Sequence, residues 1–228
     1  MHVIFFDIDG TLINTGGSGM ESLRRAFADL FDCPPPQDIP TAGRTDRGIA
    51  RDLFHWRSVE DSAENWNRFR TAYIRHLREQ LPRRPGCVLP GVGDVLDRLA
   101  ARPDVALGLL TGNVSEGARL KLEYFGLDHH FAFGGYGEVA PERNGVAEHA
   151  LAAARQALDG AIELDRIWVL GDTLLDIQCA RHIGAKAVAV ATGMHDKHEL
   201  ARARPDVLLD NFCQAAEFWR QLDEATAA

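Results

Sequence analysis

Five short apolar runs punctuate the chain, and each is followed by polar or glycine residues. The runs cover residues 3–6, 105–110, 131–133, 167–170 and 186–191. Apart from Lys186 at the start of the last run, they are continuously apolar and do not alternate with polar positions, which is typical of parallel strands covered on both faces.

Between these runs, apolar residues recur at helical spacing. The predicted helices cover residues 91–102, 115–125, 145–158, 174–183 and 212–222. Strand and helix alternate, so the pattern predicts an α/β fold with a doubly wound parallel sheet.

Residues 14–88 break this alternation, because they contain helical patterns and no convincing strand. Helices are expected from Ser18 onward, at 48–56 and at 59–80. We therefore expect an all-helical cap domain at 14–88, inserted into an α/β core made of residues 1–13 and 89–228.

Composition and charge narrow the function classes. The 228 residues carry a formal charge of −8, which argues against nucleic-acid binding because that needs a cationic surface. The four cysteines form no CxxC pair and are expected to be reduced thiols. The apolar N-terminal run is too short for a signal peptide, and no segment has the length of a membrane span. We expect a cytoplasmic protein without membrane contact, and the sequence leaves its oligomeric state open.

Polar residues of a matched kind stand at the ends of three apolar runs. Asp7 and Asp9 follow the first, Thr111 the second and Asp172 the fourth. Because ligands of doubly wound sheets bind at the carboxyl ends of the strands, these side chains are predicted to meet in one crevice.

The segment from Asp7 to Leu12 reads DIDGTL. Two carboxylates placed two residues apart can divide the work: one attacks an electrophile and the other carries a proton to the leaving oxygen. Gly10 permits the tight turn that follows. The alternative is an acidic turn that merely closes a strand.

The polar residues after the second and fourth apolar runs suggest an anion site and a metal site. Thr111 offers a hydroxyl, and Gly112 and Asn113 lead into a helix N-terminus, where free amides favour an anion such as phosphate. An ordinary helix-capping loop is the alternative. Asp172 and Asp176 lie four residues apart, and carboxylates with a phosphate form a suitable set for Mg²⁺.

Together, DxDGT(L), the strand-end threonine and GDxxxD resemble the haloacid-dehalogenase-like superfamily, and among its members the phosphatases. The helical segment after the first motif resembles the family's cap. Within it, Thr41 to Asp46 (TAGRTD) is similar to a loop of phosphoglycolate-phosphatase-like members.

The resemblance implies a role for each matching position. Asp7 matches the nucleophile and a Mg²⁺ ligand, and Asp9 matches the general acid and base, with its backbone carbonyl on the metal. Thr111 matches the hydroxyl that binds the transferring phosphoryl group. Asp172 and Asp176 match acidic residues of the metal site. Gly10, Gly112 and Asn113 are expected to contact the substrate phosphate.

One position departs from the family pattern. A lysine usually precedes the fourth strand, but no lysine lies between Phe131 and Arg166. Arg143 is the best substitute in this region, although an arginine is no neutral exchange for a lysine. Its alternative is a solvated loop arginine. Lys121 is a poorer candidate, because it lies in the middle of a predicted helix.

The cap is expected to close over the site as a lid. Arg44 is the candidate for contacting a carboxylate or hydroxyl of the substrate, and the alternative is an arginine paired with a nearby aspartate such as Asp46.

The resemblance implies a Mg²⁺-dependent phosphatase that acts on a small phosphorylated metabolite, of the phosphoglycolate or sugar-phosphate type, through an aspartyl-phosphate. Asp9 disfavours a dehalogenase, and a cap without lysine disfavours a phosphonate hydrolase. A sugar-phosphate mutase, a phospho-accepting signalling domain and a non-catalytic binding member stay open as alternatives.

Overall fold

A parallel six-stranded sheet forms the centre of the protein. The computed structural model describes residues 1–159 and 162–227. The strand order is β5-β4-β1-β6-β7-β8, and every neighbouring pair is parallel. The strands are β1 (His2–Phe6), β4 (Val105–Leu110), β5 (Phe133–Gly135), β6 (Ile167–Gly171), β7 (Lys186–Val190) and β8 (Val207–Leu209).

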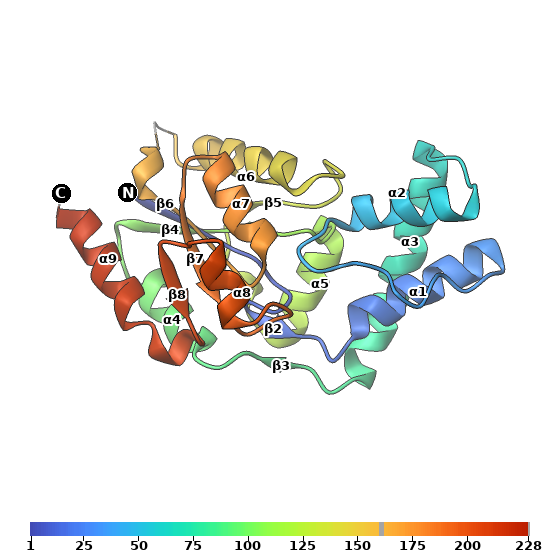
Figure 1. Ribbon diagram of the computed structural model, residues 1–228, viewed down its shortest axis with the longest axis horizontal. Coiled ribbons are helices and arrows are strands. Elements are labelled where there is room, and N and C mark those ends of the chain that lie inside the picture. The colour runs from blue at the N-terminus through green and yellow to red at the C-terminus, as the bar shows by residue number, and fades with distance from the viewer. Residues whose placement is uncertain (160–161, 228) are drawn as a thin grey trace.

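Helices cover both faces of this sheet (Figure 1). One face is packed by α4 (Val92–Ala100), α5 (Ser115–Phe125) and α9 (Ala216–Ala227). The other is packed by α6 (Arg143–Ala157), α7 (Leu174–His182) and α8 (Lys197–Arg202). Short 3₁₀ turns span Leu81–Arg83, Asp128–His130, Leu164–Arg166 and Phe212–Gln214. All residues of β1 and β6 are buried because each face of the sheet has its own apolar layer. The predicted doubly wound α/β class is confirmed.

Three further helices lie together at one end of the molecule (Figure 1). They are α1 (Ser18–Phe31), α2 (Asp46–Arg57) and α3 (Ala63–Gln80), and they bury a separate apolar cluster. The cluster contains several aromatic rings, and Phe54 contacts both Phe31 and Phe69 edge to face. These helices form the cap.

Two very short strands join the cap to the sheet. Strand β2 (Ile13–Asn14) pairs antiparallel with β3 (Cys87–Val88), so the outgoing and returning chains lie side by side. The expected division of the chain at 14 and 88 stays a prediction, and β2 and β3 lie at those two positions.

The structure differs from the expected elements in a few places. The run at 131–133 is shifted, because β5 begins at Phe133 and continues through two glycines. Strand β8 and helix α8 were not expected. The third cap helix begins at Ala63, four residues later than expected, because Ser62 caps its N-terminus by accepting a hydrogen bond from the Asn65 amide.

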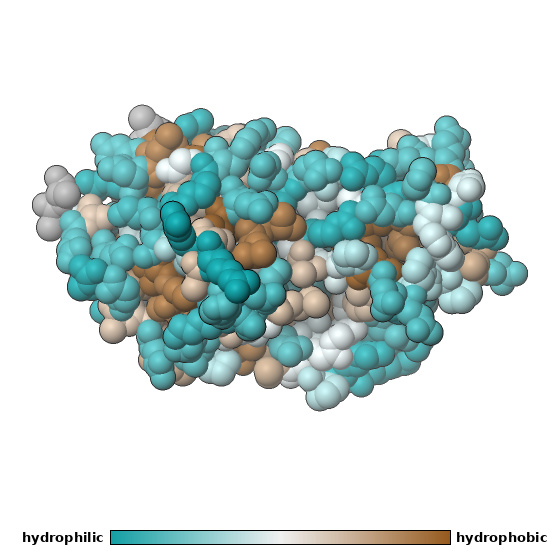
Figure 2. All heavy atoms as spheres, in the orientation of Figure 1, coloured by the Kyte–Doolittle hydropathy of each residue, from teal (hydrophilic) through white to brown (hydrophobic). Residues whose placement is uncertain are grey.

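Hydrophilic residues cover most of the visible surface, and apolar residues reach it in several separate patches (Figure 2). The four cysteines are free thiols. In the described part of the chain, no helix has both the length and the apolar character needed to cross a membrane.

Candidate active site

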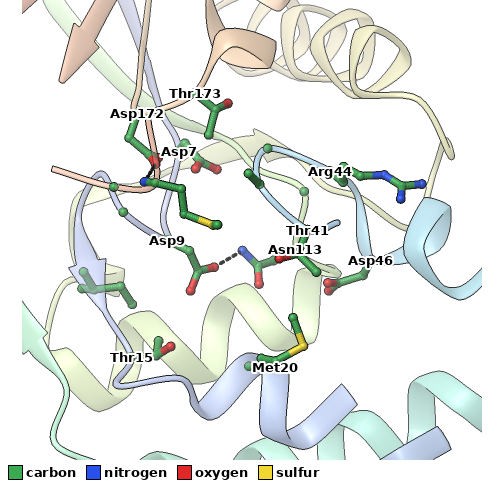
Figure 3. Close-up of a pocket in the computed structure, with 18 of the residues that line it drawn as sticks. Asp7, Asp9, Thr15, Met20, Thr41, Arg44, Asp46, Asn113, Asp172 and Thr173 are labelled. Carbon is green, nitrogen blue, oxygen red and sulfur yellow. Dashed lines mark hydrogen bonds between the residues drawn. The ribbon is translucent and has the colours of Figure 1, made fainter. Parts of the chain in front are cut away.

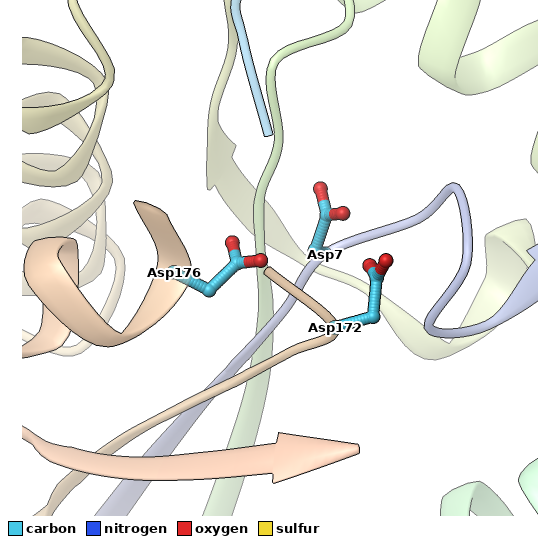
Figure 4. A group of neighbouring side chains, drawn as sticks. All are labelled: Asp7, Asp172 and Asp176. Atoms are coloured by element: carbon cyan, nitrogen blue, oxygen red, sulfur yellow. The ribbon is translucent and has the colours of Figure 1, made fainter. Parts of the chain in front are cut away.

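Three buried carboxylates converge at the carboxyl edge of the sheet (Figure 4). Asp7 follows β1, Asp172 follows β6, and Asp176 lies in the first turn of α7. One ligand oxygen of each lies within 4.8 Å of those of the other two. The predicted convergence of residues distant in the sequence is therefore present.

Asp176 is held in place by its own helix. Its Oδ2 accepts hydrogen bonds from the backbone N–H of Thr173 (3.0 Å) and from the Thr173 hydroxyl (2.6 Å). The Thr173 side chain in turn accepts from the Asp176 amide, which completes a capping box. The remaining oxygen, Oδ1, pairs with Arg143. Both oxygens of Asp176 are thus engaged within the protein.

Burial and mutual repulsion act on the other two carboxylates. The pKa of Asp7 is raised, first by burial and further by the neighbouring Asp176 and Asp9, while Arg143 opposes the rise. The pKa of Asp172 is raised by burial and by Asp176 and Asp7. Arg143 pairs with only two of the three carboxylates, so an excess of negative charge is left, and an oxygen-only donor set suits Mg²⁺. The residues therefore fit the expected metal ion.

Arg143 is the cation of this cluster. Its side chain is 4 % exposed, and Nη2 lies 2.9 Å from Oδ1 of Asp7 and 2.5 Å from Oδ1 of Asp176. Burial lowers the pKa of Arg143. The neighbouring carboxylates of Asp176 and Asp7 raise that pKa by more than burial lowers it, so the guanidinium stays charged. The alternative of a solvated loop arginine is wrong. Arg143 lies beside Asp7, the candidate nucleophile, and thus has the position expected for the cation that replaces the family's lysine.

Asp9 lies across the cavity in a different network. Its Oδ2 accepts from Asn113 Nδ2 at 2.7 Å and from Lys121 Nζ at 2.6 Å. Lys121 also donates to Asn113 Oδ1 at 2.6 Å, so these three side chains form a closed triangle of hydrogen bonds. Asn113 further donates to the buried Thr111 hydroxyl at 2.8 Å. Asp9 and Asn113 line the cavity, whereas Thr111 contacts Asn113 but is fully buried and is not one of the lining residues, so its contact with a phosphoryl group stays a prediction.

Lys121, the poorer candidate for the missing cation, lies beside Asp9, whereas Arg143 lies beside Asp7. Lys121 projects from the middle of α5, and its side chain is 3 % exposed. A signal was present in the sequence, because Lys121 falls on the same helical face as the apolar positions Ala118 and Leu122. A buried lysine within an apolar stripe needs a partner of opposite charge, and Asp9 is that partner.

The loop before α2 brings the cap against the core. The Asp46 amide donates to Gly112 O at 2.7 Å, and Oδ2 of Asp46 accepts from Val114 N at 2.9 Å. Arg143 reaches the same loop by donating to Gly43 O at 2.9 Å. The cap is therefore docked on the core.

Two glycines have a specific packing reason. Gly10 has a φ of +87°, and a Cβ there would lie 2.6 Å from a carboxylate oxygen of Asp172. A Cβ at Gly112 would lie 2.0 Å from the carbonyl oxygen of Arg44. Gly10 lets the first loop pass the metal-site candidate, and Gly112 lets the cap loop dock. Both glycines line the cavity, and their contact with substrate phosphate stays a prediction.

Arg44 lines the cavity, but its guanidinium points away from it (Figure 3). Nη2 of Arg44 lies 2.6 Å from Oδ2 of Asp52. The alternative of an arginine paired with an aspartate therefore describes this structure, with Asp52 in place of Asp46. Its contact with substrate stays a prediction.

The fold, the strand-end carboxylates and the inserted helices agree with one class of protein. The chain belongs to the haloacid dehalogenase-like hydrolase family, whose model matches residues 4–181.

Relatives and solved structures extend over nearly the whole chain. A phosphoglycolate phosphatase of Agrobacterium fabrum is 28 % identical, covering 91 % of this chain and 87 % of the relative. Probable phosphatase IndB of Dickeya dadantii is 29 % identical, covering 93 % and 90 %. The structure of CbbY from Rhodobacter sphaeroides in complex with phosphate has a TM-score of 0.73 at 19 % identity, covering 95 % of this chain and 96 % of that chain. The last likeness concerns the fold alone.

Proposed function

We propose that this hydrolase is a Mg²⁺-dependent phosphatase that removes phosphate from a small phosphorylated metabolite through an aspartyl-phosphate on Asp7. The names of its relatives support a phosphoric monoester hydrolase. Phosphoglycolate and sugar phosphates are the substrate types that the family resemblance suggests.

The observation that carries the proposal is the arrangement of the two aspartates of the first motif. Asp7 is buried against Arg143, whereas Asp9 is 42 % exposed and lies against Lys121 and Asn113. Both line one cavity. A nucleophile beside a fixed guanidinium and a proton carrier facing open space match the two tasks of phosphate-ester hydrolysis.

The chain's own residues then divide the reaction as follows. Asp7 attacks phosphorus, and the bond between phosphorus and the leaving oxygen breaks. Asp9 gives its proton to that oxygen and later takes one from the water that cleaves the aspartyl-phosphate. Arg143 stabilises negative charge on the phosphoryl oxygens, which is the main contribution of proteins to phosphoryl transfer.

Asp7 and Asp172 would hold the Mg²⁺ ion, with Asp176 supporting them through Arg143 and Thr173. When bound, Mg²⁺ supplies positive charge to the phosphoryl oxygens and offsets repulsion between these carboxylates. The assignment of the Asp9 carbonyl to the metal and of the Thr111 hydroxyl to the phosphoryl group belongs to the same proposal.

Phosphate release from an aryl phosphate and from a panel of phosphorylated metabolites tests the proposal. Asp7→Asn and Asp9→Asn should each lower kcat by at least roughly a thousandfold while circular dichroism stays unchanged. Asp97→Asn, at a 78 % exposed side chain of α4, is the matched control and should keep full activity. Undiminished turnover by Asp7→Asn contradicts the proposal. An isomerised sugar phosphate without free phosphate would instead indicate the mutase.

A further inference from the structure

We infer that the leaving-group half of the cavity selects an uncharged, hydroxyl-bearing alcohol, as in a phosphorylated polyol or sugar, and that Asp46 is the specificity-determining residue. This inference rests on the proposed phosphatase function. It separates this chain from an enzyme for a carboxylate-bearing phosphate ester such as phosphoglycolate.

The cavity has two chemically different halves. Its volume is about 400 Å³, and the sheet edge supplies the half that contains Asp7, Asp172 and Arg143. The cap supplies the other half, with side chains from all three of its helices. These side chains are Met20 and Leu23 of α1, Ile49 of α2 and Tyr73 of α3. The leaving group therefore meets an apolar wall, which suits the C–H faces of a carbon chain or ring.

The cations that line the cavity already have carboxylate partners. Lys121 lies 2.6 Å from Asp9, and Arg44 lies 2.6 Å from Asp52. Arg143 lies 2.9 Å from Asp7 and also pairs with Asp176. Among the described residues that line the cavity, every arginine and lysine is thus engaged. A substrate carboxylate would have to break one of these pairs.

Asp46 adds a negative charge at the cap side of the cavity, beside Asn113 (Figure 3). Its Oδ2 accepts from Val114 N, and no hydrogen bond to its other oxygen occurs among the described residues. That oxygen is available to accept from a substrate hydroxyl. The charged neighbours of Asp46 in the cavity lining are Asp9 and Lys121 of the core, and the three side chains together carry a net charge of −1.

The negative charge of Asp46 and its free acceptor oxygen both favour a hydroxyl over a carboxylate on the leaving group. A carboxylate on the leaving group would meet like charge in a confined site and would leave the acceptor of Asp46 unsatisfied. A hydroxyl at the same place would donate to Asp46. Replacing a terminal CH₂OH by COO⁻ in the substrate should therefore weaken binding.

Two matched pairs of compounds test this difference by competition against aryl phosphate hydrolysis at pH 7.5 with saturating Mg²⁺. They are glycerol 3-phosphate with 3-phosphoglycerate, and sorbitol 6-phosphate with 6-phosphogluconate. The inhibition constant of the polyol phosphate should be at least about tenfold lower in at least one pair, which corresponds to about 1.4 kcal/mol. Competition reports binding whether or not a compound is turned over.

The variant Asp46→Asn removes the charge and keeps an acceptor for Val114 N. It should shrink the ratio of the two inhibition constants at least threefold, mainly by tighter binding of the carboxylate compound. Glu79→Gln removes one acidic charge from α3 away from the cavity, at a 47 % exposed side chain, and should leave the ratio unchanged.

Several outcomes overturn the inference. They are equally tight binding of the carboxylate compound and the polyol phosphate in both pairs, no competition by any compound of either pair, and an Asp46→Asn variant that behaves like Glu79→Gln. Failure of the proposed function has a different signature, because wild-type protein would then hydrolyse no phosphomonoester, the aryl phosphate included.

Discussion

The Nζ atom of Lys121 lies 2.6 Å from Oδ2 of Asp9, and the same ammonium group donates to Asn113. A residue two helical turns into α5 thereby fixes the side chain proposed as the proton carrier. Because Lys121 is 3 % exposed, its ammonium group is nearly cut off from solvent, and Asp9 and Asn113 supply the hydrogen-bond acceptors that water would otherwise provide.

Lys121→Met is expected to lower kcat for an alkyl phosphate by about a hundredfold, because Asp9 loses the contact that positions it. The loss should be smaller for an aryl phosphate, whose leaving oxygen needs less protonation. Arg119→Met, at a 54 % exposed side chain of the same helix, is the control. Equal losses on both esters would mean that Lys121 only supports the fold.

Arg143→Ala is expected to lower the free energy of unfolding by about 3–5 kcal/mol, because Asp7 and Asp176 lose their buried partner. Arg143→Lys should recover part of this stability, since it keeps the charge without the fork of donors. Urea unfolding in the absence of Mg²⁺ measures both. Arg155→Ala, at an exposed position of α6, should change stability by less than about 0.5 kcal/mol, and an equal effect at the two sites would contradict the ion-pair assignment.

Asp46→Asn is expected to stabilise the protein more at pH 8 than at pH 5. Enclosure between cap and core raises the pKa of Asp46 to about 6, although part of its surface reaches the cavity. A raised carboxyl pKa means that stability is lost as the pH rises from about 4 through 6, where the enclosed group becomes charged. Because asparagine carries no charge, the variant avoids this loss, and its free energy of unfolding at pH 8 should exceed that of the wild type by about 1–3 kcal/mol. Urea unfolding of both proteins at both pH values measures this difference. A larger stabilisation at pH 5 than at pH 8 would contradict the raised pKa of Asp46.

Mg²⁺ is expected to raise the melting temperature by several degrees, because it offsets the repulsion between Asp7, Asp172 and Asp176. EDTA should reverse the rise and abolish phosphate release. Asp172→Asn should remove the response to Mg²⁺ without unfolding the protein. A melting temperature that ignores Mg²⁺ in wild-type protein would contradict the metal site.

The sequence predicted the parts of the site that are local to strand ends. Asp7 and Asp172 follow buried runs, and in a parallel sheet such positions must meet at one edge, so the pattern was sufficient. Strand β8 escaped prediction because its three residues, Val207–Leu209, are too few to show a periodicity.

The contributions of Lys121, Arg143 and Asp46 depend on how separate elements pack. Lys121 reaches Asp9 across 112 positions of the chain, and Arg143 reaches Asp176 across 33. No local spacing relates these pairs. Arg143 could be named only through a family resemblance, and whether it was buried or solvated could be decided only by the position of α6 beside α7.

Strands β2 and β3 carry the chain into the cap and back through one antiparallel ribbon, with Ile13 opposite Val88 and Asn14 opposite Cys87. Both crossings are therefore joined at neighbouring points of a single narrow stem. The whole cap can therefore be replaced by joining another segment at β2 and β3, which lie next to each other. The sheet that carries the carboxylates stays intact in such an exchange. Recombination between relatives at these two sites would replace the apolar wall of the cavity and leave the carboxylates at the sheet edge unchanged.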